Sequence, residues 1–288
     1  MGVKRLLRGA ICVAAVILLS SCSGVKPWQL PSAFDKGTVC AKWPVDSISD
    51  PGFGKTLKEL KKRSDIEYVQ IDVTGYQLSV NSPEIVLLPL GFSDRGGEKQ
   101  FDQALRVSEK KLKDSVRRVH GLGLKVLLVP KLKVVDNEDG LYGRGDIGFT
   151  TEEEWSRWFD EYRDFILYYA GKARKYRVEM FSVGDGLSFT QERSDKWKNI
   201  IESVRRKYRG ELVYAAGLET YDMIDSWENI DYIGINMNYV IAEEKAPDLH
   251  AIKAGLWKWS DSVGSWRPGT GRPVIFKEIG PRAAVEAE

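Results

Sequence analysis

Short apolar segments, rich in β-branched and aromatic residues, alternate along the chain with longer segments whose apolar residues recur at helical spacing. The short segments are typical of buried strands and the longer ones of amphipathic helices. Their alternation predicts parallel βαβ units, because a crossover helix returns the chain to the same end of the sheet. We expect strands at residues 38–43, 68–73, 125–129, 178–183, 212–216, 232–236 and 274–276, and helices at 53–62, 101–121, 152–176 and 194–208.

Turn and capping residues set the expected ends of several elements. Gly121 marks the end of the helix before it, and Pro130 is expected to end the third strand. The residues at 74–100 are expected to form a long loop. Two threonines followed by three glutamates at 150–154 predict a helix start, because a Thr side chain caps the helix and acidic side chains favour its first turn.

Seven such strands fit an α/β fold of the parallel (β/α)8, TIM-type barrel, as one domain over residues 36–288. An eighth unit is not visible after the seventh strand. Either the sequence is truncated there, or the segment after Gly37 closes the sheet. We favour truncation, because an open sheet edge leaves backbone groups of its strand unpaired.

The first 22 residues have the pattern of a bacterial secretory signal. Basic residues precede an apolar run at 10–19 that is too short for a transmembrane helix, and Leu19-Ser20-Ser21-Cys22 ends it. This ending resembles a lipobox, whereas the alternative is an ordinary signal with a chance Cys. We expect lipidation of Cys22, a tether at 23–35, and a lipid-anchored protein of the bacterial cell envelope on its periplasmic or outer-surface side.

Composition narrows the function classes. A net charge of +2 over 288 residues indicates no polyanion partner, so nucleic-acid binding is not expected. Cys12 belongs to the signal and Cys22 to the lipid, which leaves Cys40 alone and predicts no disulfide framework. With two histidines in the chain, a His-based metal site is not expected either. We therefore expect no metal, no cofactor and a monomer.

A short apolar run at 274–276 is followed closely by one carboxylate, Glu278. In a parallel barrel the C-terminal ends of the strands hold the catalytic groups, and a retaining glycosidase uses a carboxylate there as its nucleophile. The alternative is a Glu that is ion-paired across the barrel mouth, to Arg282 or Lys131.

Five further stretches share their order and spacing with one enzyme family. They are residues 120–130, 154–170, 193–216, 231–235 and Phe276-Lys277-Glu278-Ile279-Gly280. Together they resemble glycoside hydrolase family 113, a β-mannanase-like group of retaining enzymes with catalytic Glu residues on strands four and seven. The resemblance covers about residues 36–282 and implies that Glu278 is the nucleophile.

The strand-four acid/base position departs from this family. Where the family has Gly-Thr-Glu-Leu, this chain has Gly184-Asp185-Gly186-Leu187, so Gly186 replaces the proton donor. Either Asp185 swings in to donate the proton, or it orients a neighbour or binds a sugar hydroxyl. Glu219, just after strand five, is a second candidate donor, and its alternative is a loop carboxylate near a helix start.

Other polar and aromatic residues at the expected barrel mouth are candidates for substrate binding. The resemblance places Tyr239 beside the nucleophile, although Asn238 stands where the family often has a second Tyr, and the alternative for Tyr239 is an aromatic residue at the rim. Gln77 and Lys131 follow strands and are suited to contact sugar hydroxyls, with solvated loop positions as the alternative. Trp266 is a candidate for stacking on a sugar. The glycine-rich segment 140–148 lacks phosphate-loop spacing and is expected to be a lid or substrate loop.

These observations favour a retaining β-glycosidase that acts on mannan-like or other polysaccharides or oligosaccharides. The alternative is a catalytically degenerate barrel that serves as a glycan-binding or envelope-structural lipoprotein. The two differ in one geometric feature, a second carboxylate within about 5–6 Å of Glu278.

Overall fold

The computed structural model describes residues 37–39, 51–64, 66–87, 97–136, 142–223, 229–237, 248–255, 257–258, 261 and 272–277. The chain divides into two units, Met1–Asp35 and Lys36–Glu288, and the fold below is that of the second. The expected helices are present as α3 (Pro51–Ser64), α4 (Gly97–Gly121), α5 (Glu152–Tyr176) and α6 (Ser194–Lys207). The strands are β1 (Gly37–Val39), β2 (Tyr68–Gln77), β3 (Ile85–Val86), β4 (Lys125–Val134), β5 (Met180–Asp185), β6 (Glu211–Gly217), β7 (Tyr232–Asn236) and β8 (Val274–Lys277).

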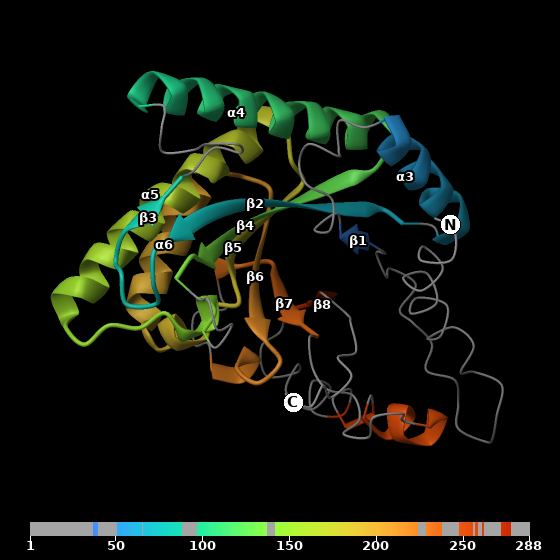
Figure 1. Cartoon of the computed structure of the whole chain (residues 1–288). Coiled ribbons are helices and arrows are strands. Elements are labelled where there is room, and N and C mark those ends of the chain that lie inside the picture. Colours follow the sequence, from blue (N-terminus) through green and yellow to red (C-terminus); the bar gives the residue numbers. More distant parts are fainter. Residues whose placement is uncertain are drawn as a thin grey trace. The chain divides into compact units, whose positions relative to one another are not determined.

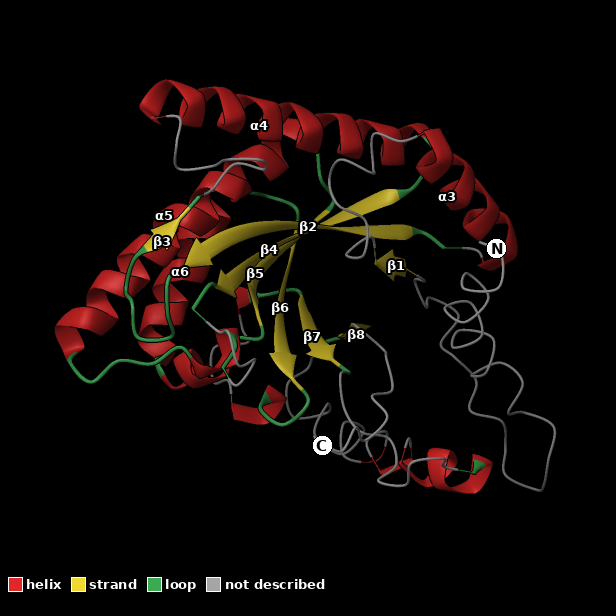
Figure 2. Ribbon diagram, viewed as in Figure 1, coloured by secondary structure: helices red, strands yellow, loops and turns green. Residues whose placement is uncertain are grey.

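Seven of these strands are parallel neighbours in the order β1-β2-β4-β5-β6-β7-β8, and β3 pairs antiparallel with β2. From β1 to β6, the helices α3, α4, α5 and α6 join consecutive parallel strands, which is the predicted βαβ alternation. The strands curve around a common interior while α4, α5 and α6 lie outside them (Figures 1 and 2). This is the arrangement of a parallel α/β barrel. Among the described residues, no helix has both the length and the hydrophobicity needed to cross a membrane.

Two of the predicted boundaries are wrong, and they lie on the neighbouring parallel strands β4 and β2. Pro130 does not end its strand, because β4 continues to Val134. The recorded pairs of β4 with β5 end at Leu128, and beyond it β4 pairs with β2 alone, so a residue without an N–H is tolerated there. The expected loop at 74–100 is also partly strand, since β2 extends to Gln77 and turns back into β3.

The predicted start of α5 is confirmed. The Thr151 side chain accepts a hydrogen bond from the Glu154 N–H, and the Glu154 carboxylate accepts one from the Thr151 N–H. This reciprocal capping box satisfies two N–H groups that a helix start would otherwise leave free. The helix then packs its apolar face against the barrel, where Trp158, Tyr162 and Trp197 of α6 form a connected aromatic cluster.

This aromatic cluster leaves no room at one glycine of β5, which gives a first prediction. A Cβ on Gly184 would lie 2.4 Å from the Tyr214 ring and 3.1 Å from Trp197. Gly184→Ala is therefore expected to lower the free energy of unfolding, measured in urea, by about 1–3 kcal/mol through overpacking. Gly54→Ala is the matched control, because nothing lies within 4 Å of its added Cβ and Ala suits the helix interior better. Equal stability of the two variants would refute the packing argument.

Candidate functional site

The interior face of the barrel changes from apolar to polar toward the C-terminal ends of its strands. Leu127, Val129, Met180 and Val213 form a small apolar cluster against Tyr68, Tyr232 and Ile275. Side chains two residues apart on a strand share a face. Further along these strands the same face carries polar side chains, which are Gln70, Asp72, Lys131, Ser182, Asn236 and Lys277. Polar groups thus gather where parallel barrels place their chemistry.

A β-bulge brings Asp185 onto the same face. On β5, Ser182 pairs with Val213 of β6, but Gly184 already pairs with Tyr214, so Val183 is the extra residue. A bulge changes which face the following side chains occupy. Asp185 therefore pairs with Ala215 and points inward, although simple alternation from Ser182 would have sent it outward. The Tyr162 hydroxyl stabilises the bulge by donating to the Val183 carbonyl at 2.9 Å.

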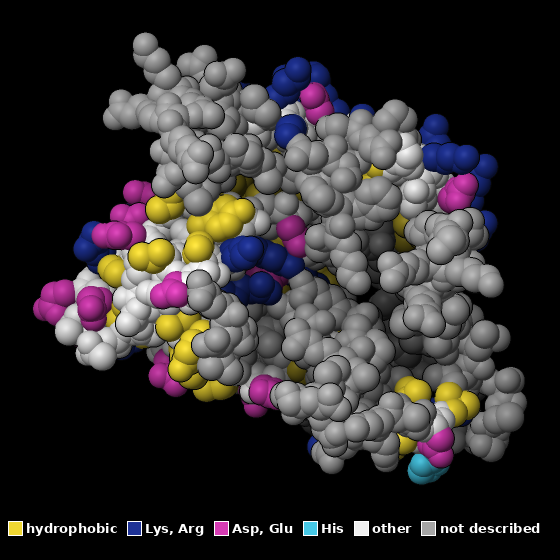
Figure 3. Space-filling model, viewed as in Figure 1, with side chains coloured by type: hydrophobic (Ala, Val, Ile, Leu, Met, Phe, Trp, Pro, Cys, Tyr) yellow, Lys and Arg dark blue, Asp and Glu magenta, His cyan; other side chains and the backbone are white. Residues whose placement is uncertain are grey.

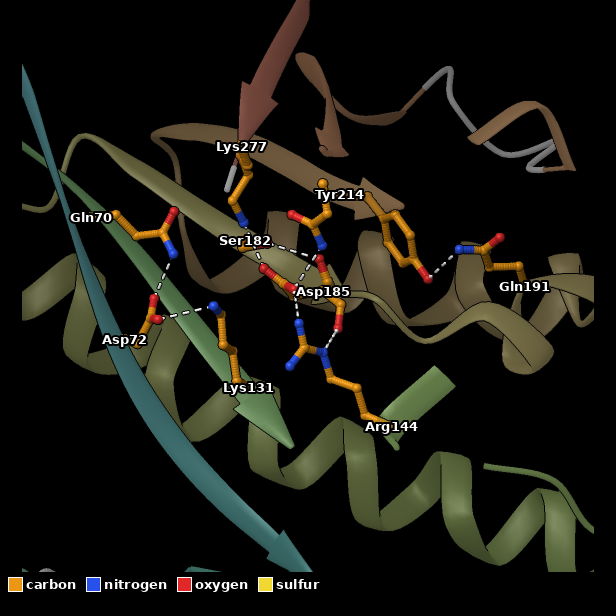
Figure 4. A network of polar contacts seen from close by, with 11 residues as sticks. Gln70, Asp72, Lys131, Arg144, Ser182, Asp185, Gln191, Tyr214 and Lys277 are labelled. Carbon is orange, nitrogen blue, oxygen red and sulfur yellow. Dashed lines mark hydrogen bonds and ion pairs between the residues drawn. The ribbon is translucent and has the colours of Figure 1, made fainter. Parts of the chain in front are cut away.

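Asp185 is the centre of a charged network (Figure 4). Lys277 Nζ lies 2.6 Å from its Oδ2, Arg144 Nη2 lies 2.7 Å from its Oδ1, and Asn236 donates to Oδ1 at 3.1 Å. The Asp185 side chain is 0% exposed. Burial alone would raise the pKa of this carboxyl, but the charges of Lys277, Arg144 and Lys131 hold it well below its usual value.

These contacts argue against the predicted role of Asp185 as proton donor. A general acid needs a pKa near the working pH, and an ionised carboxylate that accepts from two cations carries no proton to give. The geometry instead matches the other role considered for this residue, which is to orient its neighbours. Asp185 holds Lys277, Arg144 and Asn236 at the strand ends.

A second pair lies beside this network. Lys131 Nζ is 2.9 Å from Asp72 Oδ2, and Gln70 Nε2 donates to Asp72 Oδ1 at 2.6 Å. The Asn236 amide nitrogen donates to Asp185 Oδ1, which fixes the orientation of the amide. With the amide flipped, its oxygen would face the carboxylate oxygen of Asp185. Its buried Oδ1 then has no hydrogen-bond partner among the described residues. A buried acceptor at this position is suited to a ligand hydroxyl.

The position of the missing acid is occupied from a different segment. Gly186 has φ +64°, a left-handed conformation that favours glycine. A Cβ there would lie 2.9 Å from Arg144 Nε, the atom that donates to the Asp185 carbonyl at 2.7 Å. Arg144 belongs to the short helix η3 (Arg144–Asp146), within the glycine-rich segment predicted to be a lid or substrate loop. A guanidinium thus lies where a side chain at 186 would begin.

The predicted substrate-binding residues within the described ranges take different places. Gln77 is not on a loop: it ends β2, fully buried, donates to the Ser79 carbonyl and accepts from Trp158. This placement contradicts a sugar-facing position, because both polar ends of its amide serve internal bonds. Lys131 lies within β4 and belongs to the site through Asp72. Glu219 follows β6 and is exposed, and it remains a candidate.

Four predicted residues lie outside the described residues: Glu278, Tyr239, Trp266 and Cys22. Their roles, and the lipid anchor with its envelope localisation, stay predictions from the sequence. Within the described residues, no group of three or more His, Cys, Asp and Glu side chains is arranged to hold a metal ion.

Sequence reasoning missed three members of this network, which are Arg144, Asn236 and Lys277. Lys277 had a usable signal, because it lies two residues after Ile275 on the face that Ile275 lines. Asn236 had a similar signal, because it lies four residues after Tyr232, which packs against the same cluster. Arg144 had none of this kind, since a loop residue has no alternation that fixes where its side chain points.

Comparison with known proteins agrees with this architecture. The sequence model of Glycoside Hydrolase Family 113 matches residues 48–288. A solved GH113 beta-1,4-mannanase superposes with a TM-score of 0.65 at 24% identity, over 84% of this chain and 71% of that chain. The GH113 beta-mannanase of Alicyclobacillus acidocaldarius, solved with ManMIm, gives 0.65 at 22% identity, over 84% and 69%.

A more distant structure shares the fold. The hyperthermostable endo-1,4-beta-D-mannanase of Thermotoga petrophila RKU-1 gives a TM-score of 0.53 at 12% identity, over 88% of this chain and 81% of that chain. No curated protein sequence matches the chain. The structural likenesses confirm the predicted (β/α)8-barrel fold, and the family match confirms the resemblance found in the sequence motifs.

Proposed function

This chain belongs to glycoside hydrolase family 113, whose members act on O-glycosyl bonds, and we propose that it is a retaining β-glycosidase for mannan-like polysaccharides or oligosaccharides. The observation that carries the proposal is the ring of charged and hydrogen-bonding side chains on the inner face at the strand ends, centred on Asp185. Two similar structures are named as β-mannanases, which supports mannan as the substrate class.

In the proposed reaction Glu278 is the nucleophile. It directly follows Lys277, the last residue of β8, at the end of a barrel strand. Its carboxylate attacks the anomeric carbon, the bond to the leaving oxygen breaks, and the electron pair of that bond stays with the leaving oxygen. Water then displaces the carboxylate from the anomeric carbon and its proton passes to solvent. Retention follows from the two successive inversions.

The described residues act by binding and orienting. Asp185 stays ionised and fixes Lys277, Arg144 and Asn236, while the free Oδ1 of Asn236 accepts a hydrogen bond from a sugar hydroxyl. Gly186 supplies no proton to the leaving oxygen, and Asp185 is unsuited to do so. The enzyme is therefore expected to favour leaving groups that need little protonation.

Gly186 and Asp185 also support a second candidate function. With glycine at position 186 and Asp185 held between two cations, a barrel that binds a glycan without cleaving it is consistent with the site. The binding function needs the hydrogen-bonding groups of the strand ends, but it does not need Glu278 as a nucleophile.

Hydrolysis by the full chain distinguishes the two functions. We expect the wild type to release dinitrophenolate from 2,4-dinitrophenyl β-mannoside, and Glu278→Gln to release none above background. Natural β-mannan has a sugar leaving group that needs a proton. The wild type should therefore cleave it more slowly than the activated mannoside, because the usual general-acid contribution of about 10²–10⁴-fold is missing. Circular dichroism checks that both proteins are folded. Folded wild type that is no faster than Glu278→Gln on the activated substrate would exclude the glycosidase and leave glycan binding.

A further inference from the structure

Arg144 is a charged group at the site that the proposed reaction does not yet use. It reaches the end of β5 from η3, with Nε on the Asp185 carbonyl and Nη2 on its carboxylate, both at 2.7 Å. Its Nε would also be the nearest atom to a Cβ on Gly186. The guanidinium therefore lies on the side of the site where the resemblance to the family places the proton donor and hence the leaving group.

The segment that presents Arg144 is bonded to itself and to a neighbouring turn, and it lies close to η4. Asp146 accepts from the Gly143 N–H at 2.8 Å, which closes η3 on itself. The Gly148 N–H donates to the Val80 carbonyl at 3.1 Å, which ties the segment to the turn between β2 and β3. On its other side, a Cβ on Gly145 would lie 3.5 Å from Ser188 Oγ, at the start of η4 (Ser188–Glu192). Arg144 is thus held in place before any ligand arrives.

The charge of Arg144 is only partly neutralised within the described part of the site. Lys131 pairs with Asp72, and Lys277 pairs with Asp185, which leaves Arg144 to share a carboxylate that already has a cation. Lys277 is enclosed, with 2% of its side chain exposed, whereas 28% of the Arg144 side chain is exposed. Basic side chains are visible near the middle of the face drawn in Figure 3. Arg144 is therefore a cation of the site that solvent and ligands reach.

We propose that Arg144 binds an oxyanion, a phosphate or a carboxylate, on the leaving group of the substrate. This inference rests on the proposed glycosidase function and names the class of leaving group. A guanidinium is suited to the task, because its planar N–H groups match the oxygens of phosphate and carboxylate. The oxyanion is either the departing group itself, as in a glycosyl phosphate, or a substituent of the departing group.

The chemistry of the step explains why a cation replaces an acid here. When Glu278 attacks the anomeric carbon, the leaving oxygen takes the electron pair of the broken bond and departs as an anion. A positioned cation stabilises that developing charge, and the stabilisation is larger where water is excluded. A phosphate or an acidic phenol leaves without a proton, so a carboxylic acid is not required and Arg144 assists its departure through charge alone.

The test compares two aryl β-mannosides with phenols of equal acidity, one with a carboxylate on the ring and one with a neutral substituent. We expect the full chain to prefer the carboxylate by about tenfold in kcat/KM, the effect of one charge-assisted hydrogen bond. Arg144→Gln should lose the preference and Arg144→Lys should keep part of it. The control Arg157→Gln should keep all of it, because Arg157 pairs on the surface with Glu84.

Turnover of β-mannosyl phosphate would identify the departing group itself as the oxyanion, and its absence would assign the oxyanion to a substituent.

Binding of inorganic phosphate, measured by calorimetry, gives a readout that needs no turnover. The wild type and Arg157→Gln should bind phosphate, and folded Arg144→Gln should not. If the wild type cleaves no mannoside but binds phosphate through Arg144, the glycosidase function fails and the oxyanion site stands. Equal rates on the two aryl mannosides, or phosphate binding that survives Arg144→Gln, would overturn the inference.

Discussion

Replacing Asp185 with Asn is expected to lower the free energy of unfolding by about 3–5 kcal/mol, because it leaves a buried charge without its partner. Asp185 is the partner recorded for Lys277 among the described residues, and 2% of the Lys277 side chain is exposed. In the variant this ammonium must either stay charged away from water or lose its proton. Both outcomes destabilise the folded state. Urea unfolding at neutral pH, with circular dichroism as the signal, measures the loss.

Two controls separate buried charge from other causes. Adding Lys277→Met to Asp185→Asn removes both charges, so the double variant should be more stable than Asp185→Asn alone. Glu84→Gln breaks the exposed pair with Arg157 and should cost at most about 1 kcal/mol. A double variant as unstable as the single one would contradict the argument.

The stability lost in Asp185→Asn should become smaller as the pH falls. The pKa of Asp185 is depressed by folding, since its cations outweigh the effect of burial. Its stabilising contribution is therefore complete above the unfolded pKa of about 3.9 and is lost as the pH falls toward the folded value. The stability difference between wild type and Asp185→Asn should narrow below about pH 4.

Periodicity of the sequence predicted most of the barrel for a physical reason. Buried strands and amphipathic helices each have a repeat that burial imposes, so β7 and α5 begin and end at the predicted residues. The same logic failed at Pro130, because it treats proline as a strand end. Proline is tolerated in β4 because the pairs between β4 and β5 end at Leu128, before Pro130. The end of that pairing depends on β5, so the sequence of β4 does not reveal it.

The site was harder to predict because it depends on departures from periodicity. Asp185 reached the interior through the bulge at Val183, which a pattern of alternating residues does not reveal. Arg144 comes from a loop more than forty positions away, and its contact with Asp185 is set by tertiary packing. The sequence did show that Gly186 replaces an acid in the family pattern. It did not show that an arginine lies against that glycine.

Restoring the acid is expected to need two changes, Gly186→Glu together with Arg144→Ala. Gly186→Glu alone places a side chain at φ +64°, which costs about 1–2 kcal/mol, and its Cβ would lie 2.9 Å from Arg144 Nε. An arginine beside the new carboxyl would also keep it ionised, so this variant should gain no activity on β-mannan. Removing Arg144 frees the space and lets the carboxyl hold a proton. The double variant should cleave β-mannan about 10²–10⁴-fold faster than the wild type, the contribution of a general acid.

The matched control is Gly186→Gln with Arg144→Ala, which has the same shape without an ionisable group. Its rate on β-mannan should not exceed the wild-type rate, while the glutamate version should lose activity as the pH rises through the pKa of the new acid. Both double variants should lose the preference for a carboxylated aglycone, because Arg144 is absent from both. Wild-type turnover of the activated aryl mannoside, combined with no gain in the glutamate double variant, would show that position 186 does not face the leaving oxygen. The acid would then have to come from elsewhere, and Glu219, which is exposed just after β6, would be the residue to test next.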